Sequence, residues 1–427
     1  MLPFPILPIE LNNFIYLNCD KNTQYVLHHT CKFWFAPHDK YENWIIGQEL
    51  GEYCAINGYP DLLTWMINQG MYCNSKICNT AAKHGHKNVI KLCKLHGYDI
   101  TTCDFAAESG NFELLQWLHK KGCEITSHTC SLACKSGNFE TVKWLHDSGY
   151  QFHHSICRYA AYSGNIELLQ WLHSKNYPLS EHTFDLAVAG GHLHIVIWLY
   201  ENKCLFNTST CQRAARNGHF EILKWLREHN CPWDTLTNSD AAYSGHFEIL
   251  KWSYNNGCPL STYVYEQAIG GGHVEIWEWL NEQDCPMKNS VYRTAALYGH
   301  LNILKLLHVK GYSIKKDVFN FAAAGGHLHI LKWLYKNNFP LSKWMREKAA
   351  YGGHLHILKY IYEQGFYDDW NVNICKQAAI RGHFHIIHWL ILHGCPFDET
   401  ICETAAKYSQ KQLLKLMNKF GCKCKYH

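Results

Sequence analysis

The octapeptide GHFEILKW occupies residues 218–225 and returns unchanged at residues 245–252. The two copies start 27 residues apart, and each follows a pair of alanines. A histidine and a glutamate in so short a motif could belong to a metal site or an acid–base site. The spacing of the copies offers another explanation, because it matches a period that extends through most of the chain.

The glycine that opens the octapeptide recurs along almost the whole chain. Between Gly110 and Gly353 every interval is 27 residues, and similar units on both sides bring the total to fourteen, with Ser409 in the glycine position of the last unit. We number positions within a repeat from this glycine, so the histidine of GHFEILKW is at position +1. A fixed period of this size is typical of a solenoid, in which each repeat packs against its neighbours.

Within each repeat, the pattern of small and apolar residues predicts two helices. Alanine occupies position −4 in all of the last thirteen repeats, which lets two helices approach closely. Apolar residues at positions +4, +5 and +8, such as Ile222, Leu223 and Leu226, lie on one face of a second helix. Proline often follows, as at Pro232 and Pro259, and stops that helix. The predicted fold is therefore all-α, a helical-repeat solenoid of helix–turn–helix units.

Composition limits the kind of protein and its partners. Residues 1–14 have no basic residue before the apolar ones and contain three prolines, and no run reaches the length of a membrane span, so we expect an intracellular, cytoplasmic protein. The 40 basic and 36 acidic residues are spread along the chain, which predicts no nucleic-acid and no membrane partner. In a reducing compartment the 21 cysteines are expected to be thiols.

The repeat resembles the ankyrin repeat, which carries an alanine pair, Gly-His and then paired aliphatic residues. The matching residues are Ala214 and Ala215, Gly218 and His219, and Ile222 and Leu223, and the resemblance covers about residues 45–424. The family unit is about 33 residues long. Alignment places the missing residues in the loop that carries the family's β-hairpin finger, so we expect shortened or missing fingers. This arrangement is similar to the short ankyrin-like arrays of giant viruses and some protists, for which the cytoplasm would be that of the host.

The recurring histidine and tryptophan have structural explanations. A single histidine per repeat does not form a zinc cluster, since neighbouring helix axes are about 8–10 Å apart, so we expect the +1 histidine to cap or brace the second helix. A metal site or a pH response is the alternative. Tryptophan at position +7 is replaced by leucine in some repeats, so we expect it to fill the space between adjacent second helices rather than to stack on nucleobases. Cysteines recur at positions −7 and +13, as expected for buried thiols.

No pattern in the sequence indicates catalysis or a cofactor. The chain has no phosphate-binding loop, and the triple glycine at residues 270–272 lies at a helix–helix turn without the preceding strand that a dinucleotide site requires. A catalytic triad could still be assembled from distant residues, but nothing in the sequence singles one out. We therefore predict a protein that is not an enzyme, with no metal and no cofactor.

The segment before the repeats resembles the F-box. Residues 1–40 would form this small helical module, and the repeat array would occupy residues 41–427 and end in a polar cap that begins at Ser409. The residues that match the family's opening and closing motifs are Leu7, Pro8, Glu10, Leu11, Cys31 and Trp34. The resemblance implies that the module docks onto the adaptor of a cullin-type ubiquitin ligase. The alternative is a hydrophobic cap that shields the first repeat.

Resemblance to ankyrin arrays also implies where a protein partner would bind. Such arrays use the concave face, which is lined by the first helices, and the variable position −2 is expected to face the partner. The residues expected to bind a partner are Lys83, Glu108, Lys135, Tyr162, Arg216, Tyr243, Leu297 and Tyr351. The prediction is a monomeric receptor that presents a captured protein to a ubiquitin ligase. The alternative is a scaffold that binds or sequesters a protein without any ligase role.

Overall fold

The computed structural model describes residues 51–68, 74–98, 103–283, 291–365, 370–408, 413, 414 and 417. Within these residues the chain forms helices and no strand, which confirms the all-α repeat solenoid and the absence of β-hairpin fingers in the described loops. The F-box-like segment at residues 1–40 and the start of the polar cap at residues 409–412 lie outside the described residues.

Each repeat contributes a first helix, a turn at its glycine and a second helix. The first helices are α5 (Ser75–Lys83), α7 (Asp104–Glu108), α9 (Ser127–Ser136), α11 (Cys157–Ser163), α13 (Glu181–Gly190), α15 (Thr208–Arg216), α17 (Thr235–Ser244), α19 (Tyr263–Gly271), α21 (Val291–Tyr298), α23 (Val318–Ala324), α25 (Met345–Gly352), α27 (Val372–Ile380) and α29 (Glu399–Lys407). The second helices are α4 (Pro60–Asn68), α6 (Lys87–Leu95), α8 (Phe112–Lys120), α10 (Phe139–Asp147), α12 (Ile166–Ser174), α14 (Leu193–Glu201), α16 (Phe220–Glu228), α18 (Phe247–Asn255), α20 (Val274–Glu282), α22 (Leu301–Val309), α24 (Leu328–Lys336), α26 (Leu355–Glu363) and α28 (Phe384–Leu392).

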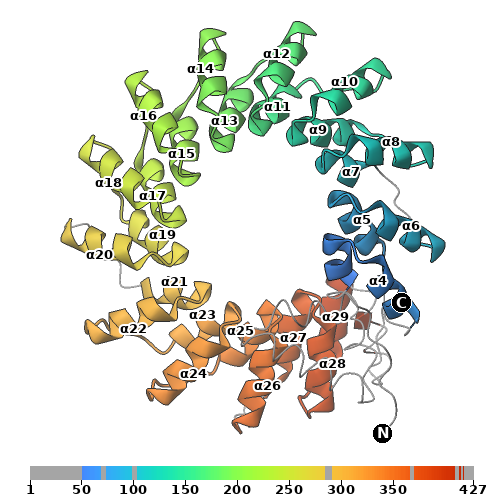
Figure 1. The fold of residues 1–427 in the computed structure, drawn as a ribbon. Coiled ribbons are helices and arrows are strands. Elements are labelled where there is room, and N and C mark those ends of the chain that lie inside the picture. Colours follow the sequence, from blue (N-terminus) through green and yellow to red (C-terminus); the bar gives the residue numbers. More distant parts are fainter. Residues whose placement is uncertain are drawn as a thin grey trace, which may run out of the picture. The chain divides into compact units, whose positions relative to one another are not determined.

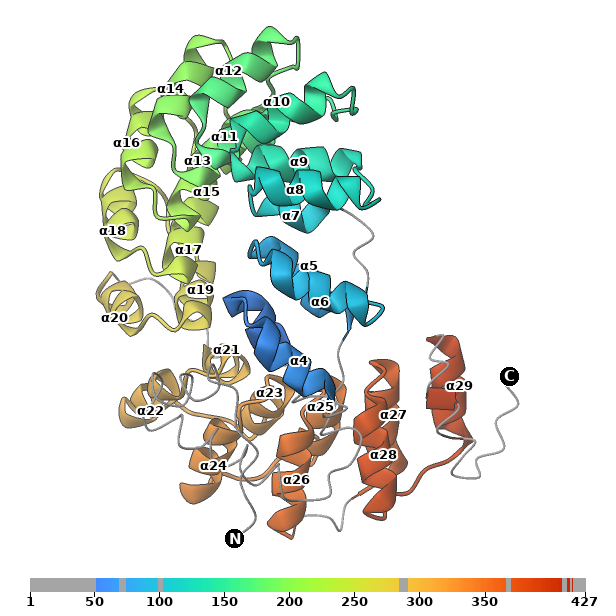
Figure 2. The ribbon, with the colours of Figure 1, turned by 45° about the vertical axis from the view of Figure 1, so that its right-hand side comes forward.

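The chain divides into two compact units, residues 1–206 and 207–427, and the boundary falls between α14 and α15. Within each unit the first helices pack side by side in one row, and the second helices form another row behind them (Figure 1). A second view shows the same two rows in each unit (Figure 2). The face formed by the first helices and the face formed by the second helices are therefore two separate surfaces.

The core of each repeat is built from its most regular positions. Ala214 and Ala215 on α15 and Ile222, Leu223 and Leu226 on α16 are all at most 2% exposed. The small alanines allow the two helices of a repeat to pack closely, and the aliphatic face of the second helix covers them. The positions that repeat in the sequence are therefore those that hold the helices together.

The repeating glycine is required by its backbone and by the next repeat. Gly245 has a φ of 80°, a left-handed conformation that residues other than glycine rarely adopt. A Cβ atom at this position would lie 2.4 Å from Cε1 of His273 in the following repeat. The pairing of glycine with histidine in the motif therefore records a contact between adjacent repeats, with the glycine of one repeat packed against the histidine of the next.

The +1 histidines, which we call the histidine row, join successive repeats. In eight of these histidines the Nε2–H donates to the backbone carbonyl at position −2 of the preceding repeat, over 2.9–3.2 Å. That carbonyl belongs to the last turn of a first helix, where backbone acceptors lack intrahelical donors. The bonds run from His86 to Ile56, His192 to Tyr162, His246 to Arg216, His273 to Tyr243, His300 to Gly270, His327 to Leu297, His354 to Ala324 and His383 to Tyr351.

This geometry corrects one part of the sequence interpretation. In the second helices α18, α22 and α26 the histidine occupies the N-cap position but makes no side-chain hydrogen bond to its own helix. The histidine therefore braces the array between repeats and does not cap the helix. Where asparagine replaces it, both functions occur: Asn165 accepts from the backbone N–H of Leu168 over 2.9 Å and donates to the carbonyl of Gly137 over 3.0 Å.

The +7 tryptophans lie between adjacent second helices, as the sequence predicts. Trp171 and Trp252 pack edge-on against the +2 phenylalanine of the preceding repeat, Phe139 and Phe220, with ring centroids 5.5 Å apart in both pairs. All +7 tryptophans are partly buried. An edge-to-face aromatic pair adds stability beyond the area that it buries.

The periodic cysteines are buried, as expected. Those described at positions −7 and +13 include Cys103 with Cys123 and Cys211 with Cys231, all buried free thiols. Burial raises the pKa of Cys103 to about 12, which keeps this thiol protonated and unreactive at neutral pH. Cys402 differs from the thiol prediction because it is disulfide-bonded.

Candidate functional site

The candidate site is the set of position −2 residues on the first helices, which we call the first-helix row. Position −2 directly follows the alanines at −4 and −3 on the last turn of the first helix, and the helical rotation turns its side chain away from the face that they bury. Among these residues Tyr162 is 39% exposed, Tyr243 37% and Leu297 36%. The row therefore combines a fixed backbone with side chains that differ from repeat to repeat.

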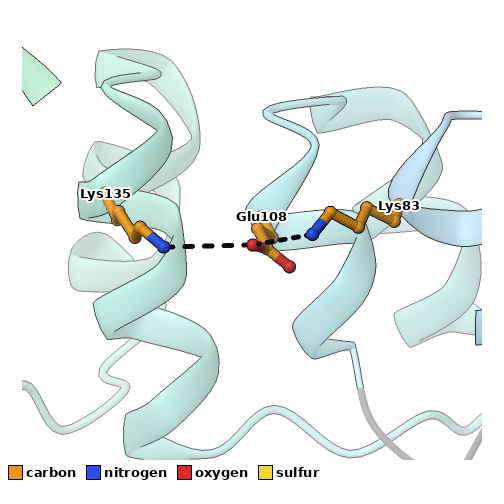
Figure 3. Close-up of polar contacts among 3 residues, drawn as sticks. All are labelled: Lys83, Glu108 and Lys135. Carbon is orange, nitrogen blue, oxygen red and sulfur yellow. Dashed lines mark hydrogen bonds and ion pairs between the residues drawn. The ribbon is translucent and has the colours of Figure 1, made fainter. Parts of the chain in front are cut away.

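In the first unit the structure brings four of the predicted residues together. The ammonium groups of Lys83 and Lys135 lie 3.2 and 4.0 Å from the same carboxylate oxygen of Glu108 (Figure 3). Lys135 also lies over the ring of Tyr162, with 6.0 Å from its Nζ to the ring centroid. Because these ion pairs are exposed, each stabilises the fold by about 0.2–1 kcal/mol at most. They leave the lysines available to a partner.

In the second unit the predicted residues are Arg216, Tyr243, Leu297 and Tyr351, and the backbone carbonyl of each accepts a hydrogen bond from the histidine row. The guanidinium of Arg381, one repeat further on, lies 4.7 Å from the ring centroid of Tyr351. Burial raises the pKa of Asp240, and the charge of Arg216 opposes this shift. The histidine row thus fixes the backbone of the residues that the first-helix row presents.

Sequence reasoning missed a second column of residues at position −5. Residues three apart on a helix share a face, so position −5 lies beside position −2, and that spacing could have identified it. Arg158 donates to the hydroxyl of its neighbour Tyr159, at position −5, over 2.8 Å, and its guanidinium lies 4.7 Å from that ring centroid. Phe321, also at position −5, has the guanidinium of Arg293 at 5.8 Å from its ring centroid. The first-helix face therefore carries Arg–aromatic pairs in both units.

The described residues contain no arrangement typical of a metal centre. No group of three or more His, Cys, Asp and Glu side chains in that part of the chain is placed to hold a metal ion. His354 and His356 lie close together, with ring centroids 5.8 Å apart, but each donates its Nε2–H to a separate backbone carbonyl. None of the helices among the described residues is long and apolar enough to cross a membrane.

Comparison with known proteins identifies the repeat type in one part of the chain. Residues 130–173 match the family model of ankyrin repeats (many copies). This stretch contains α10, α11, most of α9 and nearly all of α12. No curated protein matches the chain. The fold is that of a helical-repeat protein, and residues 130–173 are similar to ankyrin repeats.

Solved structures of helical-repeat proteins match the chain only distantly. Two crystal structures of the pentatricopeptide repeat protein PPR10 in complex with an 18-nt psaJ RNA element, one of them with three cysteines replaced by serine, are each 12% identical to this chain, with a TM-score of 0.33. Each match covers 88% of this chain and 64% of the other, so this chain spans less than two thirds of their length. PPR10 from maize is 11% identical, with a TM-score of 0.32, and the match covers 98% and 79%.

Proposed function

We propose that this protein is a non-enzymatic binding protein that captures another protein on its first-helix face. The observation that carries the proposal is the first-helix row: exposed side chains of changing chemistry stand on a backbone that is repeated and hydrogen-bonded from one repeat to the next. A rigid scaffold with variable contact residues lowers the entropy cost of binding and allows specificity to be set residue by residue.

The chemistry of the exposed residues supports a protein partner. Tyr162 and Tyr243 are exposed on the row, and arginine lies against tyrosine at Arg158 and Tyr159. Tyrosine and arginine are enriched among the residues that dominate protein–protein binding energies, because they provide a large contact area together with hydrogen-bonding groups. We expect the partner's main contacts on these residues.

For residues 1–40 we propose an F-box-like role, in which Leu7, Pro8, Glu10, Leu11, Cys31 and Trp34 contact a cullin-ligase adaptor while the repeats hold the substrate. This proposal rests on the sequence motif alone. The alternative is a repeat scaffold that sequesters its partner and uses these residues as a cap. Both alternatives place partner capture on the repeats and differ in what the amino terminus does.

Affinity purification of full-length protein and of protein lacking residues 1–40 separates the two alternatives. The receptor function predicts that a ligase adaptor co-purifies with the full-length protein and is lost on deletion or in the double variant Leu7→Ala/Pro8→Ala. A partner that is retained by the shortened protein with no adaptor bound to either form would support the scaffold. Detection of neither adaptor nor protein partner with either form would contradict both.

A variant pair tests the first-helix row directly. Tyr243→Ala removes an exposed ring on the row, and Tyr254→Ala removes a partly buried ring on the second-helix side of the same repeat. Loss of the captured partner with the first change and not with the second is expected. Equal loss with both changes would place binding elsewhere, provided that both variants keep their helical circular dichroism.

A further inference from the structure

One stretch of the second unit is strongly basic, and it includes second helices that lie behind the first-helix row. Ten Lys and Arg residues but only three Asp and Glu residues occur between residues 300 and 363, all within a described part of the chain. The whole chain has a formal net charge of only +4. The nearly balanced charges of the whole chain therefore hide a local excess of positive charge in the repeats that contain the second helices α22, α24 and α26.

The exposed face of these second helices carries a row of lysines that we call the lysine stripe. Lys305, Lys332 and Lys359 each occupy position +6, on three consecutive second helices of one unit. All three are exposed, and none has an ion pair with any other described residue. The helices α22, α24 and α26 that carry the stripe follow one another along the second-helix row (Figures 1 and 2).

Earlier repeats of the same unit show what position +6 looks like when its charge is neutralised. Lys224 and Lys251 also lie at position +6, but each pairs with a glutamate three residues before it, Glu221 at 2.8 Å and Glu248 at 3.2 Å. In the lysine stripe the corresponding residues are Asn302, His329 and His356, which carry no negative charge. The stripe is therefore a row of unneutralised charges, and the paired lysines provide a matched comparison in the same fold.

A small apolar cleft lies beside the stripe. It is lined by residues that include Tyr335, Leu341 and Tyr360, and Tyr335 and Leu341 are 43% and 38% exposed. The Nζ of Lys332 lies 5.4 Å from the ring centroid of Tyr360, which places the charge at the edge of the cleft. A surface that offers positive charges next to an exposed apolar cleft is suited to a ligand with carboxylates and one apolar side chain.

We propose that the lysine stripe and the adjoining cleft bind an acidic, extended protein segment with one apolar anchor residue. Neighbouring helix axes in such arrays are about 8–10 Å apart. A segment in the polyproline II conformation returns to the same face every three residues and advances about 9 Å in doing so. Acidic residues at every third position would therefore meet successive lysines of the stripe. The apolar side chain of the segment would pack on the exposed Tyr335 and Leu341 at the mouth of the cleft, beside Lys332.

Binding of a labelled peptide to full-length protein tests the proposal. The peptide has glutamate at every third position, one leucine near its centre and serine or proline elsewhere, and binding is followed by fluorescence anisotropy at low and moderate salt. We expect saturable binding that salt weakens, and that falls when the peptide's glutamates become glutamines or its leucine becomes serine. The triple variant K305Q/K332Q/K359Q should bind roughly tenfold more weakly, as expected for the loss of three exposed ion pairs.

The control variant K224Q/K251Q removes lysines from the same position in repeats where they are paired, and it should bind like the unchanged protein. Equal weakening by both variants would overturn the proposal, because binding would then follow total charge. Absence of saturable binding would overturn it as well. Single-stranded RNA and anionic phospholipid vesicles are tested in the same way. If either binds more tightly than the peptide, and the triple variant loses that binding, the assignment to a protein segment is overturned.

Discussion

Replacing His300 tests whether the histidine row holds successive repeats together. The Nε2–H of His300 donates to the carbonyl of Gly270 over 2.9 Å, and Gly270 is a buried residue in the last turn of α19. Removing the imidazole leaves that carbonyl without its donor. Loss of such a bond costs about 1 kcal/mol, and leaving a buried acceptor unpaired adds to the cost. We therefore expect His300→Ala to lower the free energy of unfolding by about 2 kcal/mol.

Asparagine at the same position provides the matched comparison. At Asn165, whose φ of −85° is close to the −86° of His300, asparagine both caps its own helix and donates to the glycine carbonyl of the preceding repeat. In His300→Asn the amide is expected to reach the carbonyl of Gly272 and to cap α22. An asparagine N-cap stabilises a helix by about 0.5–2 kcal/mol relative to alanine. His300→Asn should therefore be about 1–2 kcal/mol more stable than His300→Ala.

Two measurements check this pair of variants. Urea unfolding followed by tryptophan fluorescence and circular dichroism gives the order of stabilities. Because a repeat array need not unfold in one step, hydrogen exchange of peptides from α19 to α22 locates the effect, with faster exchange in His300→Ala near Gly270. A stability of His300→Ala equal to that of the unchanged protein would refute the bracing role, and equal stabilities of the alanine and asparagine variants would refute the expected capping by asparagine.

Three further predictions concern the same contacts between repeats. Burial lowers the pKa of His327 and His354, so the unfolded chain takes up protons at a higher pH than the folded protein. The free energy of unfolding should therefore be full above about pH 6.5 and fall as the pH drops through the lowered folded-state pKa. Urea unfolding midpoints at pH 7.5 and 5.5 measure this loss. Gly245→Ala should lower the free energy of unfolding by about 1–3 kcal/mol, and with it the melting temperature, because alanine is strained at a φ of 80°. An unchanged melting temperature would contradict this account. Trp252→Ala should lower the free energy of unfolding by about 2–3 kcal/mol, because it removes the contact with Phe220, and Trp252→Leu should lower it by about half as much. Equal unfolding midpoints for the two variants would count against the packing role of Trp252.

The repeating architecture could be predicted from the sequence because the same contacts are made in every repeat. Alanine at position −4, aliphatic residues at +4, +5 and +8, and glycine at the turn recur with the period, and a period identifies a solenoid directly. The absence of strands in the described loops also agrees with the short repeat. The solvent exposure of Tyr162 and Tyr243 in the first-helix row could be predicted in the same way, because it depends only on helical geometry.

The tertiary structure decided which groups from different repeats meet. The sequence places His273 at the start of its own helix, but in the structure it packs on Gly245 and donates a hydrogen bond to the carbonyl of Tyr243, both in the preceding repeat. The sharing of Glu108 by Lys83 and Lys135 likewise joins residues about one repeat apart in the chain. A periodic sequence therefore determines the local unit, because its interactions are short-range. Contacts between units depend on how the units stack.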